Sequence, residues 1–206
     1  MAALRRGNMR YCGLKYLLAL ALVPMMSIAA ASCGHDANTP ASVNEDTIAY
    51  REFSLDAESF SLETRTSGTI FVKRDAAEEG GRRVVISARV EIDPADWGGV
   101  SFSIPIGWEV SSVTSDYPQG SPHPENYTST LYTGSTQGEY QRIVEVGNTR
   151  HGAAQPQGGV GSVIIELVPM PGNQDLGASL GILIGVGSSE GYILGPVHDI
   201  FLVSLN

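Results

Sequence analysis

The sequence predicts an all-β protein folded as an antiparallel β-sandwich. Apolar residues recur at every second position in several short segments, as expected of strands that bury one face. Clusters rich in glycine and proline separate these segments, and no stretch longer than about ten residues carries a helical apolar period. In a chain of 206 residues this pattern favours a sandwich, with a closed barrel as the alternative.

Residues 1–32 are typical of a bacterial export signal. Basic residues come first, an apolar run follows, and small residues precede a cysteine: Arg5, Arg6, Arg10, Lys15, then Leu17 to Ile28, then Ala29 to Ser32 and Cys33. This order is the pattern of a lipoprotein signal peptide. The sequence therefore predicts lipidation at Cys33 and a lipid-anchored, extracytoplasmic protein at the cell membrane or cell surface.

Two alternatives remain open at this signal. Ala30 occupies the position three before the cysteine, where bacterial lipoproteins most often carry leucine. Ordinary secretion with a cut near Ala31 is therefore the alternative. Met9 is a second candidate start, and either start leaves the exported chain unchanged.

The charge of the exported chain limits its partners. Without the four basic residues of the signal, nine basic residues face 22 acidic ones, a net charge of about −13. This balance argues against nucleic acid or anionic lipid as a partner, because both require a basic surface. Cys12 lies within the signal, so Cys33 is the only exported cysteine and no intramolecular disulfide is expected.

Residues 33–67 are expected to hold the lipidated cysteine and a tether. Residues 34–46 are small and polar, which is typical of a flexible spacer. The stretch from Ile48 to Thr66 is compatible with one or two early strands, because Tyr50, Phe53 and Leu55 alternate with polar residues. We expect the sandwich domain to span residues 68–206.

The strands expected in that domain follow the alternation in chain order. They are Thr69 to Lys73, Val84 to Ile92, Val100 to Ile106, Glu109 to Thr114, Tyr140 to Val146, Ser162 to Val168, Leu180 to Val186 and Asp199 to Leu205. In the second of these, valine, isoleucine and alanine share one face while polar and charged residues share much of the other. Turn residues such as Asp93-Pro94 separate the segments.

The order of these segments resembles the opening of a cohesin domain. The resemblance is carried by Gly68 to Val72, the turn Glu78 to Gly81, the strand Val84 to Ile92, and Trp97-Gly98-Gly99 before the next strand. Residues 159–167 and 199–205 are similar to later strands of that family, so the resemblance covers residues 68–206. Cohesins share their jelly-roll-like sandwich with several carbohydrate-binding modules. The resemblance implies this fold and an extracellular binding role.

The segment from Ser115 to Tyr140 is the least strand-like part of the domain and holds candidate ligand-binding residues. We select Tyr117, Asn126, Tyr127 and Tyr132. Tyrosines with small polar neighbours suit recognition of protein or sugar, because they offer apolar area together with a hydroxyl. The alternative is a surface loop whose tyrosines pack back onto the sheet.

The two tryptophans lead to different expectations. Trp108 follows an apolar strand, so core packing is expected. Trp97 lies in a turn, where an exposed ring that contacts a ligand and a ring packed on the core are both open, and we select it as a fifth candidate. Asp93 and Asp96 flank that turn, and we expect them to cap it rather than bind Ca²⁺, since no EF-hand-like spacing occurs.

The sequence shows no catalytic motif, so no enzyme activity, cofactor or metal is expected. The four histidines are scattered, and neither HExxH nor GxSxG occurs. The sequence favours a membrane-anchored binding lipoprotein whose sandwich recognises a protein or polysaccharide at the cell surface. The alternative is a structural or accessory lipoprotein of the cell envelope without a small ligand.

Overall fold

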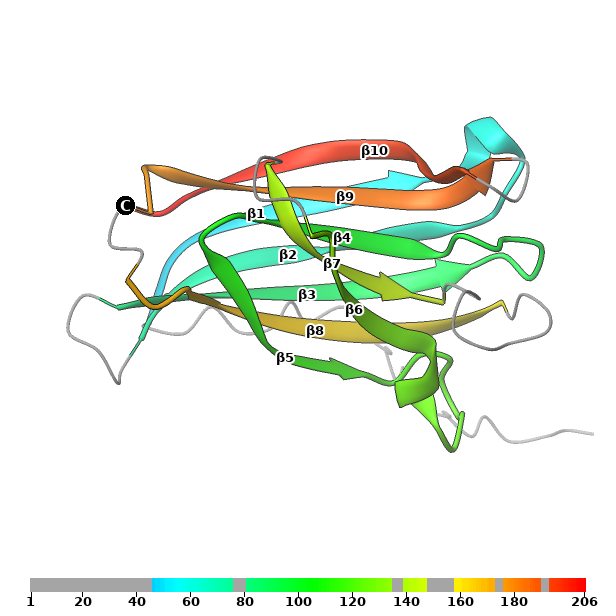
Figure 1. Ribbon diagram of the computed structural model, residues 1–206. Helices are drawn as coiled ribbons and strands as arrows, with labels where there is room; N and C mark the ends of the chain where they lie inside the picture. The colour runs from blue at the N-terminus through cyan, green and yellow to red at the C-terminus, as the bar shows by residue number, and fades with distance from the viewer. Residues whose placement is uncertain (1–45, 76–80, 135–138, 148–157, 173–175, 190–192) are drawn as a thin grey trace, which may run out of the picture. The chain divides into compact units, whose positions relative to one another are not determined.

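The computed structural model describes residues 46–75, 81–134, 139–147, 158–172, 176–189 and 193–206, all within one compact unit, Thr39–Asn206. These residues form strands and two short 3-10 helices (Figure 1). The elements are β1 (Thr47–Asp56), η1 (Glu58–Phe60), β2 (Arg65–Arg74), β3 (Arg82–Ile92), β4 (Val100–Pro105), β5 (Trp108–Ser115), η2 (Pro124–Tyr127), β6 (Thr128–Tyr132), β7 (Tyr140–Val146), β8 (Gly159–Pro169), β9 (Ser179–Ser189) and β10 (Ile193–Ser204).

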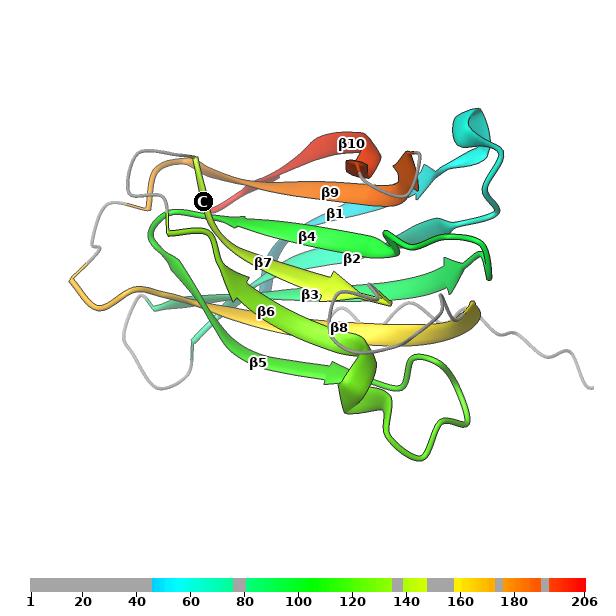
Figure 2. The same ribbon diagram turned by 45° about the vertical axis from the view of Figure 1, so that its right-hand side comes forward.

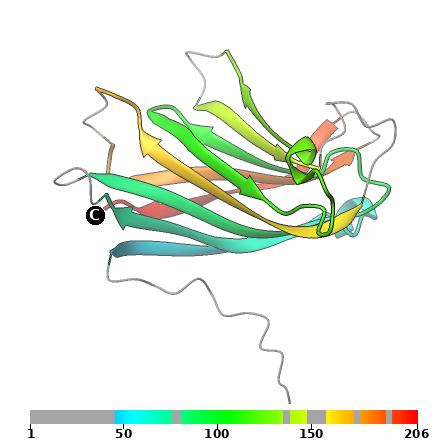
Figure 3. The same ribbon diagram turned by 90° about the horizontal axis from the view of Figure 1, so that it is seen from below.

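The strands form two five-stranded sheets. The first has the order β1-β2-β3-β8-β5 and the second β10-β9-β4-β7-β6. All paired strands are antiparallel. Figure 3 shows the first sheet running from β1 in blue to β8 in yellow, with β9 and β10 in orange and red behind it. The predicted antiparallel β-sandwich is confirmed.

Two antiparallel strand pairs that lie in different sheets are consecutive along the chain. Val84 of β3 pairs with Leu167 of β8, and Phe102 of β4 pairs with Val144 of β7. Because β4 follows β3 and β8 follows β7, the chain passes from the pair β3–β8 in one sheet to the pair β4–β7 in the other and back. This arrangement is jelly-roll-like.

The alternation seen in the sequence fills the core. On β3 the residues Val84, Ile86, Ala88, Val90 and Ile92 are all at most 4 % exposed, while their neighbours face outward. Burial of each large aliphatic side chain contributes roughly 1.5–3 kcal/mol. Trp108 is 3 % exposed, so its expected place in the core is confirmed.

Aromatic packing closes the side of the sandwich where β1 and β10 are the edge strands. The ring of Phe53 on β1 lies 6.3 Å from Phe102 and 5.6 Å from Phe201 of β10. These contacts join the two sheets through edge-to-face and tilted ring pairs, which are favourable geometries. β1 is thus part of the core structure.

The start of the sandwich and one strand differ from the sequence-based expectation. The sandwich begins at Thr47, well before the expected boundary at Gly68, because β1 pairs along its length with β2. β6 lies within the segment expected to be least strand-like, and it pairs with β7. Thr130 and Thr128 of β6 lie opposite Val144 and Val146 of β7. β6 therefore lacks the apolar alternation that marks the other strands.

Within the part of the chain that the structure describes, no helix is both long enough and apolar enough to cross a membrane.

Candidate functional site

Three loops lie at one end of the sandwich, which we call the loop end: residues 57–64, 93–99 and 116–127. They follow β1, β3 and β5, and they carry the helices η1 and η2 at the right of Figure 1. The other end holds the start of β1, where the chain enters the sandwich. Most of the candidate residues chosen from the sequence lie at the loop end.

A fully buried carboxylate fixes the 93–99 loop. Asp96 Oδ2 accepts a hydrogen bond from Thr64 Oγ1 (2.5 Å), and Oδ1 accepts from Gly98 N (2.7 Å) and Ser188 Oγ (2.9 Å). These partners come from another loop, from the same loop and from β9. Asp96 is 0 % exposed, and such a buried polar group is stable only when hydrogen-bonded in this way.

Asp93 extends the same network toward the solvent. Its Oδ1 accepts from Ala95 N (2.7 Å) and its Oδ2 from Glu63 N (2.9 Å), while Asp93 N donates to Thr64 Oγ1 (3.1 Å). Both aspartates therefore cap the turn, as expected. Among the described residues, no group of three or more His, Cys, Asp or Glu side chains is placed to hold a metal ion.

The braced loop presents an exposed indole. Trp97 is 42 % exposed, and Phe60 of η1 has the same exposure. Both loops pack on Gly187 of β9: a Cβ on Gly98 would lie 2.2 Å from Gly187 O, and a Cβ on Gly187 would lie 2.9 Å from the Ala57 Cβ. Trp97 and Phe60 are thus exposed rings on neighbouring loops, and sequence reasoning missed Phe60.

Tyr117 is a correction to the predicted site. It is 0 % exposed, so its ring cannot contact a ligand at the surface. The centroid of its ring lies 6.2 Å from that of Tyr127 in an edge-to-face arrangement. The backbone of Tyr117 packs closely on Gly161, since a Cβ at this glycine would lie 2.6 Å from Tyr117 Cα. Burial, with smaller effects from Asp96 and Tyr127, raises the pKa of the Tyr117 hydroxyl.

The other tyrosine-loop candidates separate into two places. Asn126 is exposed on η2, whereas Tyr127 is half-buried and packs against the core. Tyr132 is 55 % exposed at the far end of β6, where Arg142 lies 4.6 Å from its ring and Gln141 Nε2 donates to its hydroxyl (3.1 Å). The structure therefore places Asn126, Tyr127 and Trp97 at the loop end but not Tyr132. Cys33 lies outside the described residues.

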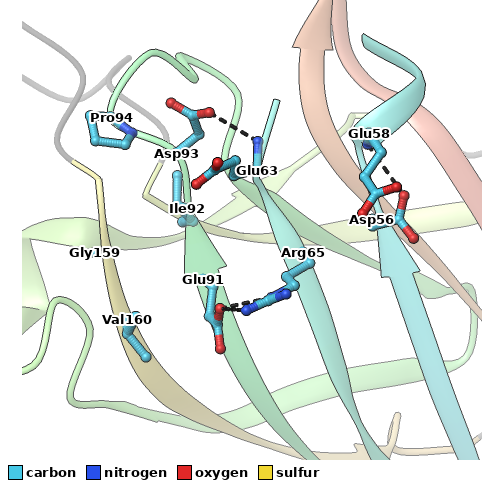
Figure 4. A pocket seen from close by; sticks show the side chains of 10 residues that line it. All are labelled: Asp56, Glu58, Glu63, Arg65, Glu91, Ile92, Asp93, Pro94, Gly159 and Val160. Atoms are coloured by element: carbon cyan, nitrogen blue, oxygen red, sulfur yellow. Dashed lines mark hydrogen bonds and ion pairs between the residues drawn. The ribbon is translucent and has the colours of Figure 1, made fainter. Parts of the chain in front are cut away.

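A groove of about 420 Å³ lies beside the Trp97 loop, and we call it the acidic groove (Figure 4). Five carboxylates and one guanidinium line it, together with apolar and glycine residues: Asp56, Glu58, Glu63, Glu91, Asp93, Arg65, Ile92, Pro94, Gly159 and Val160. It crosses the ends of β1, β2, β3 and β8. No sequence motif marks this groove, because its lining residues come from four separate segments.

One carboxylate of the acidic groove is neutralised within it. Arg65 Nε donates to Glu91 Oε2 (2.7 Å), and Arg89 Nε donates to Oε1 (3.0 Å). These hydrogen bonds, that of Arg65 first, hold the pKa of Glu91 below its ordinary value. The net charge that the groove offers a ligand is therefore set by Asp56, Glu58, Glu63 and Asp93.

A second groove, of about 310 Å³, lies between the edge strands β5 and β6, and we call it the lateral groove. Most of its lining is hydroxyl-bearing: Val113, Thr114, Ser115, Pro124, Glu125, Thr128 and Thr130. At Glu125, Oε1 lies 3.1 Å from His123 Nδ1. The sequence pointed to the tyrosines of the segment from Ser115 to Tyr140 and not to its threonines.

Comparison with known proteins leaves the family open. No family model and no curated protein matches the chain. Among solved structures the chain is similar to one described as "pH-induced modulation of Streptococcus parasanguinis adhesion by Fap1 fimbriae". The two share 12 % sequence identity over 75 % of this chain and 94 % of that chain, with a TM-score of 0.31. A TM-score this low carries no argument about family or function.

Proposed function

We propose that the chain is a lipid-anchored, extracytoplasmic binding protein whose loop end recognises a segment of a partner protein, without a catalytic role. The observation that carries the proposal is the exposed Trp97 on a loop fixed by the buried Asp96. Tryptophan is enriched among the residues that dominate binding energy at protein interfaces. The export signal and Cys33 support the anchoring.

The rigidity of the loop matters as much as the exposure of the ring. A binding surface that is ordered before contact loses less conformational entropy when the partner arrives. Three hydrogen bonds to Asp96 and two to the carboxylate of Asp93 hold the loop. Trp97 is therefore preorganised, and Phe60 on the neighbouring loop adds a second ring.

The acidic groove indicates the chemistry of the partner. Asp93 and Pro94 line the groove and also belong to the Trp97 loop, so a ligand on the indole lies next to its carboxylates. Charge complementarity favours lysine or arginine side chains there and disfavours acidic ones. A partner segment with basic and apolar residues matches the loop end.

The path of the chain suits this role. The chain enters the sandwich at Thr47, and β1 leads from that point to η1 at the loop end. A lipid on Cys33 would attach the sandwich through its other end. The loop end would then be clear of the attachment point.

Two measurements test the proposal. For anchoring, Cys33→Ser should move the protein from the membrane fraction to the soluble fraction. For recognition, the full chain in detergent micelles is offered a library of peptides rich in lysine, arginine and leucine, and a library with glutamate in place of the cations. We expect selection of the basic library and a loss of affinity of at least about tenfold in Trp97→Ala.

The control is Tyr50→Ala, because Tyr50 is 59 % exposed on β1 and lies toward the other end. It should bind the selected peptides like the wild type. Equal weakening in both variants, or no selection of basic peptides, would contradict the proposal. Absence of any ligand would favour a structural or accessory role in the envelope, and Trp97-dependent binding of oligosaccharides would replace protein by glycan as the partner.

A further inference from the structure

The lateral groove lies on the side of the sandwich where β5 and β6 are the edge strands. β5 ends the first sheet and β6 ends the second, and Figure 2 shows η2 between the end of β5 and the start of β6. Pro124 and Glu125 of η2 line the groove. On the opposite side of the sandwich, Phe53 and Phe201 fill the corresponding position with packed rings. Aromatic rings therefore close the core on the side of β1 and β10, whereas a groove remains on the side of β5 and β6.

The inward face of β6 is polar. Thr128 pairs with Val146 and Thr130 pairs with Val144, and both valines are fully buried. Thr128 is half-buried and Thr130 is exposed, so this rim of the core ends in hydroxyls and not in aliphatic side chains. Because a strand that only closes a core needs apolar residues on its inner face, the half-buried hydroxyl of Thr128 requires another explanation.

One of these hydroxyls is buried without a partner. Among the residues that the structure describes, Thr128 Oγ1 makes no hydrogen bond although it is shielded from solvent. Leaving a hydroxyl in this state costs roughly 1–3 kcal/mol. Rotation of the Thr128 side chain to another staggered rotamer would turn this hydroxyl toward the groove that Thr128 lines. A group bound there that donates to it or accepts from it would remove the cost.

The rest of the lining narrows the class of ligand. Thr114, Ser115 and Thr130 offer hydroxyls, each of which can both donate and accept. Val113 and Pro124 offer apolar surface. Glu125 is exposed, and its own backbone hydrogen bond followed by His123 holds its pKa below the ordinary value, so at neutral pH it is a carboxylate that repels anions.

We infer that the lateral groove binds a neutral, polyhydroxylated ligand of one or two sugar rings. Ligand hydroxyls match the hydroxyl lining, C–H faces of the ring match Val113 and Pro124, and Glu125 accepts from further hydroxyls. The volume of about 310 Å³ is at the lower end of the range of roughly 300–1,000 Å³ for ligand pockets, which limits the ligand to this size. This site is separate from Trp97 and the acidic groove, although Pro124 and Glu125 come from the 116–127 loop.

The test is a titration of the isotope-labelled full chain, followed by amide NMR. The probes are glucose, galactose and N-acetylglucosamine, with glucose 6-phosphate as an anionic control. We expect at least one neutral sugar to shift the amides of residues 113–115 and 128–130. Glucose 6-phosphate should bind more weakly than glucose, because of Glu125.

The deciding variant is Thr128→Val, which replaces the hydroxyl by a methyl group of similar size. It should fold normally and bind the sugar at least about tenfold more weakly, a loss of the size of one hydrogen bond. The matched control is Thr69→Val on the outer face of β2, which should bind as the wild type does. Trp97→Ala should also leave sugar binding unchanged, so failure at the loop end and failure at the lateral groove are distinguishable.

Three results would overturn the inference. The first is that no tested sugar shifts these amides at millimolar concentration. The second is that Thr128→Val binds the sugar as well as the wild type does. The third is that the shifts map to Trp97 and its loop, which would place any sugar binding at the loop end.

Discussion

The carboxylate of Asp96 and the hydroxyl of Thr128 are both shielded from solvent, but only the carboxylate is hydrogen-bonded. Each oxygen of the Asp96 carboxylate accepts at least one hydrogen bond, whereas Thr128 Oγ1 makes none among the described residues. A satisfied buried group holds the fold together, while an unsatisfied one lowers its stability. The contrast separates a residue kept for structure from one kept for binding.

Their positions explain the difference. Asp96 lies between β3 and β4, where the chain crosses from one sheet to the other, and it ties two loops to β9. Thr128 lies on an edge strand beside a groove. The crossing must be rigid for the fold to form, but the edge can remain open to a ligand.

The largest expected effect is that of Asp96→Ala. The substitution leaves Thr64 Oγ1, Gly98 N and Ser188 Oγ without their acceptor in a dry site, and hydrogen bonds to charged groups contribute roughly 1.5–3 kcal/mol each. We expect a loss of about 3–5 kcal/mol in the free energy of unfolding, measured by urea denaturation. The matched control is Asp93→Ala, which loses two hydrogen bonds nearer the solvent and should cost about 1 kcal/mol. Equal losses in the two variants would show that burial of the Asp96 network does not matter.

A second prediction concerns the close contact beneath Trp97. In Gly98→Ala the new Cβ meets Gly187 O at 2.2 Å, which is a backbone atom and cannot move aside alone. We expect about 1–3 kcal/mol of destabilisation and weaker binding at the loop end, because the loop must shift. In the control Gly181→Ala the Cβ lies 3.2 Å from the flexible tips of Ile200 and Leu202, so a smaller change in Tm is expected. A larger change in Gly181→Ala would contradict this account.

Paired threonine variants sharpen the contrast between satisfied and unsatisfied hydroxyls. Thr66 is 2 % exposed and its Oγ1 donates to Arg89 O at 3.0 Å. We expect Thr66→Val to cost about 1 kcal/mol. Thr128→Val should cost nothing or stabilise the protein, since it removes a hydroxyl that has no partner. Thermal unfolding of both variants tests this, and a loss in Thr128→Val as large as that in Thr66→Val would show that its hydroxyl is satisfied.

The sequence predicted most strands because their alternation is a local property. The expected strand Tyr140 to Val146 has the same bounds as β7, and Val84 to Ile92 lies within β3. β6 escaped prediction because its inward residues are threonines, so no apolar period marks it. The burial of Tyr117 also escaped, because it depends on Gly161, far away in the sequence.

The candidate site was predictable only in part for the same reason. Trp97 could be selected because a tryptophan in a Gly-rich turn is a local signal. The acidic groove unites residues from four segments, and only the pairing of the strands brings them together. Whether a hydroxyl such as Thr128 Oγ1 is satisfied depends on its three-dimensional surroundings and leaves no trace in the sequence.

The smallest expected effect is that of Glu91→Gln, which tests an ion pair at the surface against the buried hydrogen bonds of Asp96. In the folded state Arg65 and Arg89 hold the pKa of Glu91 below its ordinary value of 4.5. The stabilisation is therefore complete above pH 4.5 and is lost as the pH falls through the lowered pKa. Because Arg65 is 62 % exposed, we expect Glu91→Gln to cost less than about 1 kcal/mol at pH 7.

Urea denaturation of Glu91→Gln and of the wild type as a function of pH and salt checks this prediction. The difference between the two proteins should shrink at acidic pH, and at neutral pH it should fall when salt is added, since exposed ion pairs are screened. The cost of Asp96→Ala at pH 7 should change little with salt, because its hydrogen bonds are shielded from ions. A salt-independent cost for Glu91→Gln would mean that this ion pair is shielded from ions as the Asp96 network is. The acidic groove would then belong to the polar core of the fold and not to its charged surface.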